Sequence, residues 1–95
     1  MKRIYISGAI TGKTNYMEQF NEAEETLKKS GYSVINPAKI GSNMPKDTSY
    51  EEYMDMSIML LNMCDCIFML NGWQQSKGAN REYGYALAKD MTIIS

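Results

Sequence analysis

Hydrophobic and polar positions along this chain alternate between short apolar runs and longer amphipathic stretches. Four runs rich in β-branched and aromatic residues predict β-strands, at residues 3–7, 32–36, 66–70 and 91–95. The third run, "CIFML", is apolar at every position. Such continuous apolar character is typical of a strand that is covered on both faces of its sheet.

The three stretches between these runs predict helices. Within residues 15–30 the apolar side chains recur at helical spacing, at Met17, Phe20, Ala23 and Leu27. The other two helices are expected over residues 48–63 and residues 79–89. Residues 38–47 are rich in Gly, Ser, Asn, Pro and Lys, and predict a loop whose length favours a functional or mobile segment.

Local signals mark the ends of the first two helices. Asn15 with Glu18, and Thr48 with Glu51, have the spacing of a capping box, in which the first side chain bonds the backbone three residues further on. Gly31 follows the first helix, where glycine commonly adopts the left-handed conformation that ends a helix. We therefore expect these helices to begin and end at those residues.

Strands and helices alternate along the whole chain in this prediction. That order favours an α/β fold in which a four-stranded parallel sheet carries helices on both faces. The length of 95 residues favours a single domain, residues 1–95. Ligands of such sheets bind beyond the carboxyl ends of the strands, so we expect a site among residues 7–14, 36–40 and 71–78.

Composition excludes several classes of function. The formal net charge is −1 and no basic run exceeds two residues, which argues against binding duplex nucleic acid or an anionic membrane surface. No apolar stretch approaches the roughly 20 residues that cross a bilayer. The expected partner is therefore neither duplex nucleic acid nor a membrane.

The cysteine and histidine content argues against disulfide bonds and metal sites. The chain has no histidine, and its two cysteines, Cys64 and Cys66, are too close in sequence to staple a fold. A lone C-x-C is at most half of a zinc site, so two buried small hydrophobic side chains are the simpler interpretation. We expect no disulfide, no metal, no cofactor and a cytoplasmic location.

The predicted helix over residues 48–63 is apolar almost all round rather than along one stripe. A chain of this length buries only about two-thirds of its unfolded surface, so it cannot easily cover one helix on every side. A well-covered core helix is the alternative interpretation. We predict a homo-oligomer that associates through residues 49–63, because an exposed apolar patch of that size promotes association.

Glycine and serine gather after two of the predicted strands. The segment "SGAITG", residues 7–12, can bring backbone N–H groups close to a phosphate or a sugar hydroxyl, although taken alone it is better explained as a plain turn. Ser76, Lys77 and Gly78 precede the third helix, where Ser76 is either a helix cap or part of an anion site.

Three larger side chains near these segments can carry chemistry. Glu82 falls in the early turns of the third helix, where the helix dipole also favours an acid without a function. Trp73 can stack on a base or form the wall of a cleft. Tyr5 lies on the first strand, and its hydroxyl needs a polar partner if that strand is buried.

Together these residues resemble a known superfamily. The blocks "IYISGAITG", "NPA" and "CDCIFMLNGWQQSKGANREYGYA", at residues 4–12, 36–38 and 64–86, resemble the nucleoside 2-deoxyribosyltransferases. The similarity is closest to a small uncharacterised phage and bacterial branch, extends to the deoxynucleoside 5′-monophosphate N-glycosidases, and is most specific in the last block. It implies a small flavodoxin-like or Rossmann-like three-layer domain, with four strands in place of the usual five, that forms homo-oligomers.

The resemblance also implies an activity and the residues that perform it. Glu82 matches a glutamate that attacks the anomeric carbon of the sugar, and Tyr5 matches a tyrosine that positions this carboxylate. Ser76 matches a serine that contacts phosphate in the N-glycosidases, which favours a nucleotide over a nucleoside. For a small nucleoside or nucleotide ligand, the expected substrate-binding residues are Ser7, Gly8, Ala9, Ile10, Gly12, Asn36, Trp73, Ser76 and Gly78.

One departure from the family pattern leaves the function open. Ser57 stands where the superfamily usually carries an aspartate that helps to protonate the leaving base, and Asp55 would face another side of the helix. Two functions remain: an N-glycosidase or deoxyribosyltransferase that acts on the sugar–base C–N bond, or a non-catalytic nucleotide-binding module of the same fold. A small oligomeric scaffold with a vestigial cleft is a third interpretation.

Overall fold

The computed structural model describes residues 2–95. In chain order the elements are β1 (Arg3–Ser7), α1 (Tyr16–Lys29), β2 (Ser33–Ile35), α2 (Pro37–Gly41), α3 (Tyr50–Asn62), β3 (Cys66–Met69), the 3-10 turn η1 (Trp73–Gln75), α4 (Lys77–Ala88) and β4 (Thr92–Ile94). Each strand lies within the range that the hydrophobic pattern predicts.

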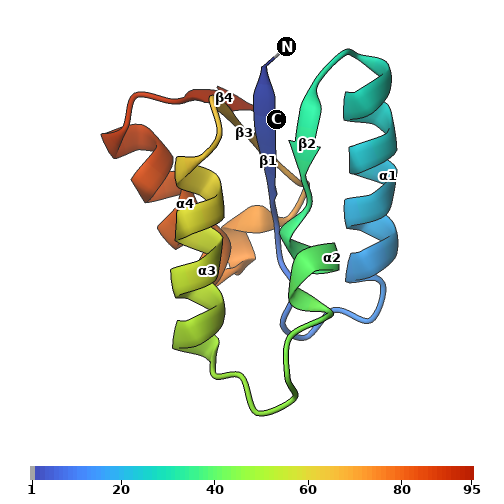
Figure 1. Ribbon diagram of the computed structural model, residues 1–95, viewed down its shortest axis with the longest axis vertical. Helices are drawn as coiled ribbons and strands as arrows, with labels where there is room; N and C mark the ends of the chain where they lie inside the picture. The colour runs from blue at the N-terminus through green and yellow to red at the C-terminus, as the bar shows by residue number, and fades with distance from the viewer. Residues whose placement is uncertain (1) are drawn as a thin grey trace.

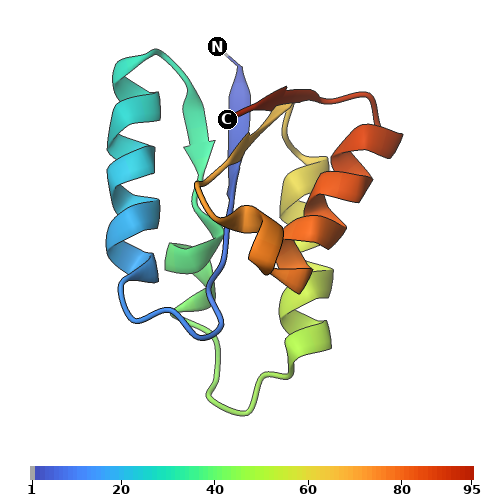
Figure 2. The same ribbon diagram turned by 180° about the vertical axis from the view of Figure 1, so that it is seen from behind.

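The four strands form one parallel sheet in the order β2-β1-β3-β4. Helix α1 lies against one face, and α3 and α4 lie against the other, as Figures 1 and 2 show from opposite sides. The predicted α/β fold, a three-layer flavodoxin-like or Rossmann-like domain with a four-stranded parallel sheet, is confirmed. The chain passes from β1 to β2 and then back across β1 to β3, so the strand order reverses between β1 and β3.

Strand β1 presents its side chains alternately to the two faces of the sheet. Ile4 and Ile6 belong to the apolar cluster beneath α1. Tyr5 belongs to the cluster beneath α3 and α4. Because successive strand residues point to opposite faces, Ser7 shares the face of Tyr5. Two hydroxyl groups therefore lie on the side of the sheet where α4 carries Glu82.

The capping box of α3 is formed by Ser49 and Glu52, so the prediction of Thr48 with Glu51 is wrong by one residue. The Ser49 hydroxyl accepts from the Glu52 backbone N–H at 3.1 Å, and the Glu52 carboxylate accepts from the Ser49 N–H at 2.8 Å. Two hydroxyl residues are adjacent here, and each precedes a glutamate by three. Thr48 makes a different contact: its hydroxyl donates to the Pro45 carbonyl at 2.6 Å.

The start of α1 also differs from the prediction, whereas its end agrees. Asn15 is the residue before the helix, but its side chain makes no capping bond, so the expected capping box with Glu18 is wrong. The backbone of Asn15 is not in the extended conformation that a capping side chain usually requires. Gly31 adopts a φ of 94°, and its N–H donates to the Lys28 carbonyl at 3.0 Å, which ends the helix as predicted.

The segment predicted as a loop over residues 38–47 begins instead with the short helix α2. The Asn36 side chain caps this helix by accepting from the Lys39 N–H at 3.2 Å, and Pro37 occupies the first helical position. A capping Asn followed by a proline whose φ suits a helix starts a helical turn. The irregular connection between α2 and α3 is therefore shorter than expected.

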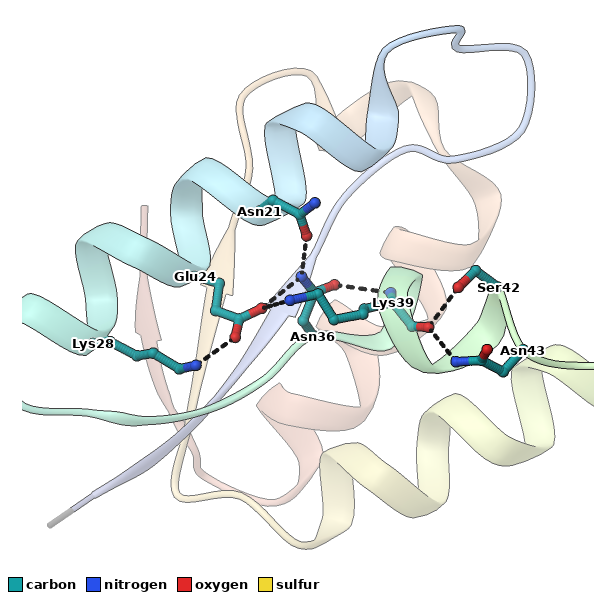
Figure 3. Close-up of polar contacts among 7 residues, drawn as sticks. All are labelled: Asn21, Glu24, Lys28, Asn36, Lys39, Ser42 and Asn43. Carbon is teal, nitrogen blue, oxygen red and sulfur yellow. Dashed lines mark hydrogen bonds and ion pairs between the residues drawn. The ribbon is translucent and has the colours of Figure 1, made fainter.

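A polar network fastens α2 to α1 (Figure 3). The Asn36 amide donates to the side chains of Asn21 and Glu24, both at 3.0 Å. The Glu24 carboxylate pairs with Lys28 at 2.7 Å and with Lys39 at 3.3 Å. Hydrogen bonds to the Glu24 carboxylate lower its pKa to about 2, and the bond from Lys28 has a larger effect than those from Asn36 and Lys39. The side chain of Asn36 is committed to this network.

Candidate functional site

Glu82 is a buried carboxylate in the second turn of α4, with 6% of its surface exposed. The helix begins after Ser76, whose hydroxyl accepts from the Ala79 backbone N–H at 3.1 Å. Ser76 is therefore a helix cap, as one interpretation of the sequence has it. Ala79 and Ala86, on the same buried side of α4, let the helix lie close to the sheet.

Two hydroxyl groups from β1 hold the Glu82 carboxylate. Tyr5 Oη donates to Glu82 Oε2 at 2.5 Å, and Ser7 Oγ donates to Glu82 Oε1 at 2.6 Å. Tyr5 and Ser7 are both fully buried. An ionised carboxylate only accepts hydrogen bonds, so it satisfies both donors at once. The arrangement fixes the orientation of the carboxylate within the sheet-facing side of α4.

Burial and hydrogen bonding act on the carboxylate in opposite directions. Burial raises the pKa of Glu82, while the hydrogen bonds from Ser7 and Tyr5 oppose that rise. The pKa of the Tyr5 phenol is raised well above its ordinary value, first by burial and then by the charge of Glu82. The phenol therefore keeps its proton and remains a donor. The site therefore combines a carboxylate of raised basicity with two neutral donors that favour its ionised form.

Glu82 and Tyr5 line a cavity of about 1050 Å³. Its walls come from the segment after β1, from α2, from α3 and from the start of α4. The cavity adjoins the carboxyl end of β1, next to the reversal of strand order, which is where open α/β sheets bind ligands. The position predicted for the site is thus the position of the cavity.

Comparison with known protein families gives a match to a model that covers residues 2–95. The chain belongs to the DUF4406 family. That family is described as a domain of unknown function. The comparison with curated proteins gives no match. The matched range contains the whole of the Tyr5, Ser7 and Glu82 arrangement of this DUF4406 domain.

Most of the residues expected at the site of the DUF4406 domain line its cavity: Tyr5, Gly8, Ala9, Ile10, Ser76, Gly78 and Glu82. Ser7 reaches the same place through its bond to the carboxylate of Glu82. Gly12 and Asn36 do not form part of the wall, and the side chain of Asn36 points to α1 instead (Figure 3).

Trp73 does not line this cavity, contrary to its expected role in contacting a base. Its ring stacks on Tyr83, with centroids 4.7 Å apart and an interplanar angle of 29°. Trp73 lies in η1, and it borders a separate, smaller cavity of about 470 Å³ beside β3 and β4. The sequence suggests contact because Trp73 closely follows a strand, but the 3-10 turn directs the ring to α4.

The sequence singles out only Ser57 of α3 as a position of the site, and does not predict the other residues of this helix that line the cavity. Helix α3 supplies five lining residues: Met56, and four that recur at helical spacing on one face, Tyr50, Tyr53, Met54 and Ser57. The apolar residues of α3 suggested a partner surface, yet part of them face this cavity. The spacing of 50, 53, 54 and 57 is the signal that could have identified this face.

Ser57 of the DUF4406 domain lines the cavity, and its hydroxyl acts on the Tyr5 phenol, partly opposing the rise in the pKa of that phenol. Asp55 is exposed and does not line the cavity, which agrees with the prediction that it faces another side of α3. A serine side chain therefore stands beside the phenol of Tyr5 in the wall of the cavity.

Within residues 2–95, no three His, Cys, Asp or Glu side chains are grouped as a metal site would require. Burial raises the pKa of the half-buried Cys64 thiol to about 11, so this cysteine is protonated at neutral pH. Over the same described range, no helix combines the length and the apolar character needed to cross a membrane.

Proposed function

We propose that this DUF4406 domain cleaves the sugar–base C–N bond of a deoxynucleotide, as an N-glycosidase or a deoxyribosyltransferase with Glu82 as its nucleophile. The observation that carries the proposal is the Glu82 carboxylate, buried, held on both oxygens by Tyr5 and Ser7, and set in the wall of a large cavity. The resemblance to nucleoside 2-deoxyribosyltransferases assigns the same role to the same residue.

The chemistry needs a fixed carboxylate beside the anomeric carbon. One Glu82 oxygen attacks that carbon, the C–N bond breaks, and the base leaves with the bonding electron pair and takes up a proton. Water then attacks the glycosyl ester, which frees the sugar and the carboxylate and releases a proton. A second base in place of water gives transfer. Tyr5 and Ser7 keep the carboxylate oriented, which lowers the entropic part of the barrier.

A panel of the four common deoxynucleosides and their 5′-monophosphates tests this function. We expect free base, measured by chromatography, and a glycosyl ester on the peptide that contains Glu82, measured by mass spectrometry after acid quenching. Glu82→Gln keeps the size of the side chain and removes the nucleophile, so it should lower base release by roughly 10³-fold or more.

Glu25→Gln is the matched control, because it makes the same charge change at an exposed position of α1, away from the cavity. It should release base at the rate of the unaltered protein. Base release no faster than that of Glu82→Gln, across the whole panel, would overturn the proposed activity.

Ser57 motivates a second candidate function, a nucleotide-binding module that does not cleave its ligand. The cavity lining carries a serine where the resembled enzymes have an acid, and a missing general acid costs roughly 10²–10⁴-fold in rate. A module of this kind should show a rise in Tm with intact nucleotide and no free base. Ser57→Asp separates the two functions: it should raise base release if slow protonation of the base is the limitation, and leave it at zero otherwise.

A further inference from the structure

Three lysines from three separate segments line the cavity that contains Glu82. Lys13 lies between β1 and α1, Lys46 lies between α2 and α3, and Lys77 is the first residue of α4. Lys13 is also positioned, because its Nζ donates to the Gln19 side chain at 3.0 Å. The cavity therefore has cationic groups on several sides of its wall.

Three other cations of the described residues are paired with carboxylates. Lys28 and Lys39 pair with Glu24, and Arg81 pairs with Glu51 at 3.1 Å. By contrast, the three cavity lysines make no ion pair within residues 2–95. Glu82 is the one carboxylate in the described part of the wall, and both its oxygens are already bonded to hydroxyl groups.

The size of the cavity, like its charge, favours a large anionic ligand. A volume of about 1050 Å³ lies at the upper end of the range of roughly 300–1,000 Å³ that is typical of small-molecule sites. A lysine ammonium binds phosphate as a point charge, and an exposed contact of this kind is individually weak. A ligand gains from lysines on three segments only if it carries anionic groups that extend across the cavity.

We propose that the cavity binds a nucleotide that carries more than one phosphate, with its di- or triphosphate chain on Lys13, Lys46 and Lys77 and its sugar at Glu82. This inference rests on the proposed function for the position of the sugar. It adds the charge and length of the ligand, which Ser76 and Glu82 do not determine.

Binding measurements along a phosphate series test the proposal. The probes are deoxyadenosine, its mono-, di- and triphosphates, and inorganic tripolyphosphate, each titrated by calorimetry at low and high salt without divalent cations. Affinity should rise along the series by roughly tenfold or more from mono- to triphosphate, and tripolyphosphate should compete with the triphosphate. High salt should reduce this gain, because the lysines are accessible to solvent.

The triple variant Lys13→Gln, Lys46→Gln, Lys77→Gln should abolish the gain from added phosphates and leave the affinity for deoxyadenosine unchanged. The matched control is Lys2→Gln, Lys29→Gln, Lys89→Gln, which removes the same charge from exposed positions outside the cavity wall. The control should keep the gain. Circular dichroism and Tm show that both variants fold.

The outcomes separate this inference from the proposed function. Equal affinity for mono- and triphosphate, or an equal loss of affinity in the control variant, overturns the polyphosphate inference, even if Glu82 releases base from monophosphates. Triphosphate binding that depends on the cavity lysines supports the inference, even if no base is released. A failure of every member of the series to bind overturns it as well.

Discussion

The candidate site of this molecule contains a small group of side chains that satisfy one another's hydrogen bonds. Glu82 has both carboxylate oxygens bonded, and Tyr5 and Ser7 each have an acceptor, although all three are buried. A buried charge of this kind disfavours folding unless it is paired or hydrogen-bonded. The carboxylate is therefore kept at a cost in stability that the two hydroxyl groups reduce but do not remove.

Glu82→Gln should make the protein more stable at neutral pH. The pKa of Glu82 is higher in the folded than in the unfolded state, so ionisation disfavours folding once the pH rises through the ordinary carboxyl range, and glutamine cannot ionise. A gain of about 1 kcal/mol would raise Tm by roughly 4–8 °C in a domain of this size. Thermal unfolding from pH 3 to pH 8 measures it.

The difference between the two proteins should shrink as the pH falls, and should vanish below the ordinary pKa of a glutamate, where the carboxyl group is protonated in both the folded and the unfolded state. A variant that is less stable than the unaltered protein at pH 7 would show that the two hydroxyl donors more than offset the burial of the charge.

At the scale of elements, the hydrophobic pattern predicts the strands and helices well, and local signals predict their ends less well. The spacing of apolar residues along the chain reflects which face of each element is buried. Because burial decides the fold, this spacing predicts the elements. The choice between Thr48 and Ser49 as the cap depends instead on a contact with Pro45, which spacing does not reveal. The network that fastens α2 to α1 joins residues distant in sequence, so it could not be predicted locally.

The contact between the residues that directly follow β1 and β3 gives a prediction at this scale. A Cβ at Gly8 would lie 2.8 Å from Leu70 Cδ1 and 2.9 Å from Leu70 Cβ, and the second atom cannot move without its backbone. Gly8→Ala should therefore destabilise the protein by about 1–3 kcal/mol. Gly84→Ala is the control, since a Cβ at this helical glycine meets no atom within 4 Å.

Gly84→Ala should stabilise the protein by about 0.4–1 kcal/mol, because alanine has the higher helix propensity and restricts the unfolded chain. Urea unfolding of both variants measures the two effects. If Gly8→Ala matched the stability of the unaltered protein, the close approach of residue 8 to Leu70 would be wrong.

At the scale of the whole molecule, the predicted self-association stays a prediction. Helix α3 is apolar almost all round because it has several environments: Leu61 is in the core, Tyr53 faces the cavity, and Met59 is 71% exposed. Met63, which directly follows the helix, is 56% exposed. Leu87 of α4 is also 52% exposed. We predict a homodimer through this exposed part of α3, because single-chain packing leaves it uncovered.

Sedimentation at decreasing protein concentration measures the association. The double variant Met59→Gln, Met63→Gln should sediment as a monomer, whereas Ile40→Gln, at an exposed apolar position of α2, should associate like the unaltered protein. A protein that is already monomeric at low micromolar concentration would contradict the prediction.

The candidate site is predicted where it depends on β1 and α4, whereas on α3 only the position of Ser57 is predicted. Tyr5, Ser7 and Glu82 are placed by strand alternation and by a capped helix, and both leave a trace in the sequence. The face of α3 that lines the cavity is decided by how the helix lies on the sheet. For the same reason Trp73 was misplaced, since its direction follows from a 3-10 turn.

The alternation along β1 has a consequence for how this sequence can change over time. Ile4 and Ile6 serve the packing of one face, while Tyr5 and Ser7 serve Glu82 on the other. Inserting or deleting a single residue in β1 would exchange the two sets, and would disrupt the packing and the candidate site in one step. Length variation should therefore be eliminated from β1.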